Sequence, residues 1–62
     1  MRILLWEKRM QKGYSTRRLS EISGISKSAI NKIENDEVSP TVETMERLAK
    51  ALECRFFELF EE

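Results

Sequence analysis

The residues that break helices are few in this chain, and they divide it into segments of helical length. Its 62 residues contain two glycines and one proline, at Gly13, Gly24 and Pro40. Glycine readily adopts the positive φ that ends many helices, and proline cannot continue one. Because the segments between them carry apolar residues at helical spacing, we expect an all-α fold. The helices are expected at roughly 2–12, 16–23, 27–35, 42–52 and 56–62.

Hydroxyl side chains directly precede three of these segments. Ser15, Ser26 and Thr41 stand where an oxygen can accept a free backbone N–H of the first helical turn. Ile25 and Ile30 have the spacing of a hydrophobic staple across the second of these starts. These signals therefore predict where the three middle helices begin.

A chain of this length predicts one domain, spanning 1–62. Such a domain buries only about 60% of its unfolded surface, so helix-on-helix packing is the least demanding core. The expected core residues of the second and third helices are Leu19, Ile22, Ile25, Ile30 and Ile33. Those of the fourth are Val42, Met45, Leu48, Ala49 and Leu52. The large aromatic residues expected to be mostly buried are Trp6, Phe56, Phe57 and Phe60.

Several function classes are disfavoured by what the chain contains. It has one cysteine, Cys54, and no histidine, which excludes an internal disulfide and any catalytic dyad that uses imidazole. It also has no glycine-rich phosphate loop, so we expect no enzyme, metal, cofactor or small-molecule ligand. No apolar run approaches the roughly 18 residues of a membrane span, and the one at the N-terminus is too short for a signal peptide. We therefore expect a cytoplasmic protein that does not contact a membrane.

The charges are unevenly distributed although the net charge is zero. Residues 1–32 carry eight basic and two acidic residues, whereas residues 33–62 carry three basic and nine acidic residues. A charge asymmetry between halves is a recognised indication of a nucleic-acid partner. The alternative is a dipolar surface without a partner.

The segments 16–23 and 27–35 are joined by the short turn Ser23-Gly24-Ile25-Ser26. Two short helices joined in this way form a helix-turn-helix, whose second helix enters the DNA major groove. The N-termini of both helices also offer backbone N–H groups to phosphates. Arg17 and Arg18, in the first turn of the earlier helix, are candidates for phosphate contacts, which position a protein without reading sequence.

The stretch LSEISGISKSAINKIEN, residues 19–35, resembles the helix-turn-helix of the Cro and phage-repressor (XRE-type) family. Residues 39–52 and 57–60 are also similar to that family, so the resemblance covers nearly the whole chain. It implies a compact five-helix, repressor-like domain with a central helix-turn-helix that binds double-stranded operator DNA. It also implies a homodimer, which we expect to form through the C-terminal helix because three phenylalanines there exceed what one short helix usually hides.

The resemblance assigns roles to individual residues. Those expected to contact base edges are Lys27, Ser28, Asn31 and Lys32. Those expected at the DNA backbone are Thr16, Arg17, Arg18 and Ser26. Arg9 and Glu34 match a pair that forms a structural salt bridge in the family. For the polar and basic residues the alternative is an ordinary solvated helix face.

Several positions depart from the family pattern. Arg18 stands where a capping-box glutamate is common, and Asp36-Glu37 replaces a loop that often has glycine and a basic residue. Two acids there would repel a phosphate, so no loop contact is assigned to Glu37. Glu53 replaces a common glycine, and a positive φ at this position would cost energy.

The leading hypothesis is a sequence-specific DNA-binding transcriptional regulator, for which repression is favoured and activation is left open. The alternative is a protein-interaction module, such as an antitoxin or a domain that kept the fold but lost DNA binding. The acidic second half of the chain and the Asp36-Glu37 loop favour this alternative.

Overall fold

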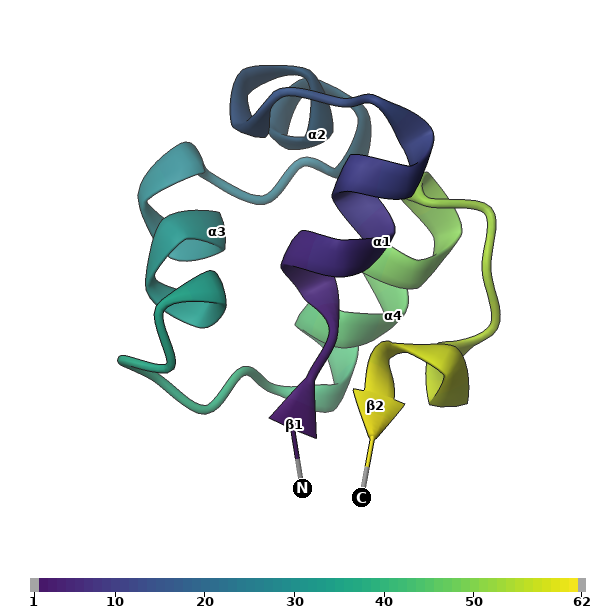
Figure 1. Cartoon of the computed structure of the whole chain (residues 1–62). Helices are drawn as coiled ribbons and strands as arrows, with labels where there is room; N and C mark the ends of the chain where they lie inside the picture. Colours follow the sequence, from purple (N-terminus) through teal and green to yellow (C-terminus); the bar gives the residue numbers. More distant parts are fainter. Residues whose placement is uncertain (1, 62) are drawn as a thin grey trace.

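The computed structural model describes residues 2–61 and contains four α-helices and a short two-stranded sheet in that part of the chain. In Figure 1, α2 crosses the top, α3 lies to one side, and α1 runs in front of α4. At the bottom of this view β1 and β2 lie side by side. The elements are β1 (Arg2–Ile3), α1 (Leu5–Lys12), α2 (Thr16–Ser23), α3 (Lys27–Glu34), α4 (Val42–Ala51), the 3-10 turn η1 (Phe56–Leu59) and β2 (Phe60–Glu61).

The local signals for the three middle helices act as predicted. Ser15 Oγ, Ser26 Oγ and Thr41 Oγ1 each accept a hydrogen bond from the backbone N–H three residues later, at 3.0, 3.1 and 3.1 Å. Gly13 and Gly24 follow α1 and α2 with φ of 73° and 77°. These are left-handed conformations that glycine adopts without steric cost. The predicted starts of α2, α3 and α4 are therefore confirmed, and their ends lie within one residue of those expected.

The two ends of the chain differ from the expected five-helix, all-α fold. Helix α1 begins at Leu5 rather than at residue 2, because Arg2 and Ile3 pair antiparallel with Glu61 and Phe60. The predicted last helix is instead the turn η1 followed by β2, and residue 62 lies outside the described residues. This pairing satisfies backbone groups of both ends that a short terminal helix would leave without partners.

One apolar core joins all four helices and η1. Its buried members are Leu5, Leu19, Ile30, Ile33, Met45, Leu48, Ala49, Ala51, Leu52 and Leu59. Partly buried residues that pack against it are Ile3, Tyr14, Ile25, Cys54 and Phe60. In the segment 2–61, no helix is long and apolar enough to cross a bilayer.

Several residues expected in the core are exposed. Trp6 is 51% exposed, Ile22 40%, Val42 65% and Phe57 66%, while Phe56 is just above one-third. Ile22 and Val42 lie at helix ends, where the core no longer reaches the side chain. In η1 only Leu59 is fully buried, because a short 3-10 turn directs few of its side chains to one side.

Candidate nucleic-acid interface

Helices α2 and α3 form a rigid pair with a well-defined turn. Leu19 and Ile30 are fully buried, and Ile33 is almost so. Within the turn, the backbone N–H of Ile25 donates to Ser23 Oγ at 3.1 Å. The N–H of Gly24 donates to the carbonyl of residue 20 at 2.9 Å, which closes the end of α2. The outer face of α3 is thus held in a fixed orientation relative to α2.

The outer face of α3 brings together the four side chains expected to contact bases. Lys27, Ser28, Asn31 and Lys32 are all exposed, and their spacing places them on one side of the helix. The opposite side carries the buried isoleucines of the core. No carboxylate of residues 2–61 lies within ion-pair distance of either lysine. The face therefore presents two ammonium groups, a hydroxyl and an amide to the solvent.

The start of α2 holds most of the residues expected at a DNA backbone. Thr16 is half-buried, whereas the side chains of Arg17 and Arg18 are 81% and 62% exposed. Both arginines lie near Glu21, at 3.5 and 3.8 Å, in exposed pairs that contribute little and can rearrange. Ser26, at the start of α3, accepts a bond as N-cap, so its hydroxyl hydrogen remains able to donate to an anion. These groups could neutralise and orient phosphates near the starts of α2 and α3.

The loop after α3 limits this basic surface. Asp36 and Glu37 are both exposed, and Asp36 adopts a φ of 59°. The backbone N–H of Glu37 donates to the Lys32 carbonyl at 2.8 Å, which keeps the loop against the end of α3. Two carboxylates at this position make a phosphate contact by the loop unfavourable.

On the side of α3 that faces α1, Arg9 of α1 and Glu34 of α3 form a bidentate ion pair. The Nε–Oε2 and Nη2–Oε1 distances are 2.7 and 3.0 Å, and both side chains are largely buried. The hydrogen bond to Glu34 raises the pKa of Arg9, against the opposite effect of burial. Arg9 therefore links α1 to the end of α3 and is remote from the exposed face.

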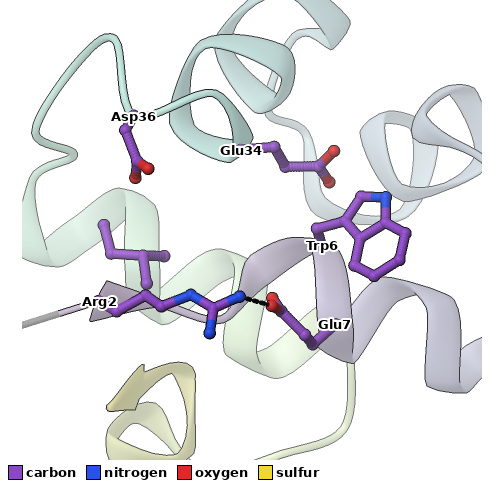
Figure 2. Close-up of a pocket in the computed structure, with 6 residues that line it drawn as sticks. Arg2, Trp6, Glu7, Glu34 and Asp36 are labelled. Carbon is purple, nitrogen blue, oxygen red and sulfur yellow. Dashed lines mark hydrogen bonds and ion pairs between the residues drawn. The ribbon is translucent and has the colours of Figure 1, made fainter. Parts of the chain in front are cut away.

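Glu34 also borders a cavity of about 220 Å³ at the β1 end of the molecule. Figure 2 shows Arg2, Trp6, Glu7 and Asp36 around the same space, with an ion pair between Arg2 and Glu7. Of its three carboxylates, Glu7 pairs with Arg2 and Glu34 with Arg9, whereas Asp36 has no ion-pair partner among residues 2–61. The lining therefore offers one uncompensated carboxylate, which lies in the loop that follows α3.

Arg47 of α4 lies beside the turn between α2 and α3, although the sequence did not single it out. Its Nη1 is 3.8 Å from the position that a Cβ would occupy on Gly24. A cation at this place is favourable beside the C-terminus of α2, which carries partial negative charge. The only sequence signal for Arg47 was its place one helical turn after Glu43, on the exposed side of α4. The two side chains form a 3.3 Å ion pair.

The fold and its central helix pair agree with a known family. Residues 7–59 match the sequence model of the family HTH_3, described as helix-turn-helix. The chain belongs to this helix-turn-helix family, of the Cro and phage-repressor (XRE) type. The predicted family membership is confirmed.

Several relatives of this helix-turn-helix chain are similar over most of its length. It is 45% identical over 58 residues to the HTH-type transcriptional regulator PuuR of Escherichia coli (strain K12). The matched region covers 94% of this chain and 31% of that regulator. It is 44% identical over 48 residues to the HTH-type transcriptional regulator SutR of the same organism. This matched region covers 77% of this chain and 27% of SutR.

A solved structure shows the same fold. The crystal structure of an HTH_3 family transcriptional regulator from Vibrio cholerae superposes with a TM-score of 0.87 at 34% identity. The match covers 90% of this chain and 32% of that one. The chain thus spans about a third of the length of the relatives it matches.

Proposed function

We propose that this chain is a sequence-specific DNA-binding domain of a transcriptional regulator and that α3 enters the major groove. The observation that carries the proposal is the outer face of α3, where polar and basic side chains project from a helix whose other side is buried. Membership of the helix-turn-helix family and the regulators named among its relatives support the same function.

In this proposal the residues divide into two groups. Lys27, Ser28, Asn31 and Lys32 contact base edges, for which lysine suits guanine O6 and N7 and asparagine suits adenine. Phosphate contacts, which set register without reading sequence, come from Thr16, Arg17, Arg18 and Ser26. The acidic loop at Asp36 and Glu37 makes no such contact.

We further propose that the regulator acts as a homodimer and represses transcription by occupying DNA near a promoter. Phe56 and Phe57 are exposed in the C-terminal segment and offer an apolar contact surface. Two copies related by a two-fold axis would place their α3 helices in half-sites about 34 Å apart. Sedimentation of the wild-type chain and of Phe57→Ser tests this: loss of the dimer in the variant supports it, and a monomeric wild type on its own DNA refutes it.

The decisive experiment is fluorescence anisotropy with a labelled duplex from the region upstream of the gene, titrated over a salt series. The Lys27→Ala/Lys32→Ala variant is compared with Lys50→Ala/Arg55→Ala, which removes the same number of positive charges outside α2 and α3. We expect the wild type to prefer this duplex over a scrambled one, and only the first variant to lose that preference. Affinity should also fall steeply with salt.

A second function, that of a protein-interaction module, is favoured by the exposed Asp36 and Glu37 directly after α3. An antitoxin that also represses its own operon would bind DNA and co-purify with a protein partner, whereas a domain that has lost DNA binding would show no affinity for either duplex, even at low salt. That result would contradict the DNA proposal for this chain and direct the search to a protein partner. Binding to both duplexes with equal affinity would contradict sequence specificity alone.

A further inference from the structure

A groove between α2 and α4 combines apolar and basic side chains. It has a volume of about 460 Å³ and is lined by Ile22, Ser23, Arg47, Lys50 and Ala51. Ile22 is one of the large apolar residues exposed on the surface, at 40%. None of the lining residues belongs to α3, so the groove is distinct from the proposed base-reading face.

The two positive charges of the groove are only partly compensated within the molecule. Arg47 pairs with Glu43 at 3.3 Å, but the two side chains are 55% and 74% exposed, so the pair is weak and can be exchanged for another carboxylate. Among residues 2–61 no carboxylate lies within ion-pair distance of Lys50, although Glu46 stands one turn earlier on α4. The two cations of the groove, Arg47 and Lys50, thus belong to the half of the chain that is otherwise acidic.

DNA is not the ligand that this chemistry favours. DNA seated in the groove would pair with Arg47 and Lys50, but it would place its charged backbone against the exposed side chain of Ile22. A protein segment that carries both apolar side chains and carboxylates satisfies both features of the groove.

We propose that the groove between α2 and α4 binds an acidic, amphipathic segment of a partner protein. An apolar side chain of the segment packs against Ile22 and Ala51, and its carboxylates pair with Arg47 and Lys50. Apolar anchors give such contacts most of their affinity, and complementary charges give orientation and rate of association. A helix laid into a groove presents its anchors one turn apart.

The test uses the full chain and a fluorescein-labelled peptide with two leucines one helical turn apart, flanked by aspartates. We expect saturable binding by anisotropy. The Arg47→Ala/Lys50→Ala and Ile22→Ser variants should each lose about tenfold or more in affinity, which corresponds to about 1.4 kcal/mol. Lys27→Ala/Lys32→Ala, which removes the same number of cations from α3, should bind the peptide as the wild type does. Far-UV circular dichroism of each variant checks that it is folded.

Three outcomes would overturn the proposal. In the first, Lys27→Ala/Lys32→Ala weakens peptide binding as much as Arg47→Ala/Lys50→Ala does. In the second, a peptide with serines in place of the leucines binds as tightly as the original peptide. Either result would mean that charge alone attracts the peptide. The third is no peptide binding together with reduced self-association of Ile22→Ser in sedimentation, which would assign the groove to a second copy of the chain. Because Arg47→Ala/Lys50→Ala should still bind the duplex, failure here leaves the DNA proposal untouched.

Discussion

Arg9 on α1 and Glu34 at the last position of α3 are joined by two hydrogen bonds in a largely buried ion pair. Arg9 Nη1 also donates to the carbonyl of Tyr14, in the segment that leads into α2, at 2.9 Å. One guanidinium therefore connects α1, the entry to α2 and the end of α3. This connection fixes the base of the helix pair whose outer face we assign to DNA.

The first prediction concerns this ion pair. Arg9→Met should destabilise the fold by about 3–5 kcal/mol, because it leaves the Glu34 carboxylate buried without a cation. Arg9→Met/Glu34→Leu should recover most of that loss, since apolar residues of similar volume often replace a buried pair at little cost. Urea unfolding followed by circular dichroism measures both. A double variant no more stable than the single one would show that the two residues are not coupled.

The parts of the fold that follow from local signals could be predicted, and those that depend on distant contacts could not. Ser15, Ser26 and Thr41 mark helix starts through bonds made within one turn. Pairing of Ile3 with Phe60 joins the two ends of the chain, and neither two-residue strand carries a recognisable pattern.

The candidate site shows the same division. The periodicity of α3 suffices to predict which of its residues are exposed, because its core side is continuous. The way α4 crosses α2 determines that Ile22 is exposed and that Arg47 lies beside Gly24. Helical spacing within one segment does not define this crossing. The contacts of each α3 residue with DNA stay predictions.

A second prediction concerns Glu53, which has a φ of 55° after α4. Glu53→Gly should raise Tm by several degrees relative to Glu53→Ala, because alanine retains the left-handed penalty that glycine avoids. Both variants remove the carboxylate, so their difference isolates the backbone. Gly13→Ala, at a φ of 73° with nothing within 4 Å of the added Cβ, should lower Tm for the same reason. Equal Tm values for the two Glu53 variants would show that the conformation carries no strain.

The third prediction is the pH dependence of the ion pair between Lys12 Nζ and Glu53 Oε1, which lie 2.8 Å apart. The hydrogen bond from Lys12 lowers the pKa of Glu53 from its ordinary value near 4.5. A lowered folded-state pKa stabilises the fold above the pKa of the unfolded chain, and this contribution is lost as pH falls through the folded-state value. The Tm difference between wild type and Glu53→Gln should thus be largest near neutral pH and vanish in acid. Molar salt should reduce it at neutral pH, and a difference that persists in acid would contradict this assignment.

A fourth prediction concerns the thiol of Cys54. Burial raises its pKa, and the charge of Glu58 adds to the effect, while Lys8 and Lys12 oppose it. Because the thiolate is the reactive form, iodoacetamide should alkylate the folded chain more slowly than the same chain in urea. Rates followed by mass spectrometry over a pH series should show the folded curve displaced to higher pH. Coincident curves would mean that the thiol is not shielded.

The last prediction separates the two roles of Ser26, which caps α3 and is assigned to a phosphate contact. Ser26→Ala should cost about 1 kcal/mol of stability through loss of the cap. Ser26→Asp should keep the wild-type Tm, because aspartate caps equally well and suits the helix N-terminus, but its charge should repel a phosphate and weaken binding to the duplex. Thr41→Asp makes the same change at the N-cap of α4, outside the proposed interface, and should leave both Tm and DNA affinity unchanged. If Ser26→Asp binds the duplex as tightly as Thr41→Asp does, Ser26 does not contact the DNA backbone, and the start of α3 lies farther from the phosphates than proposed.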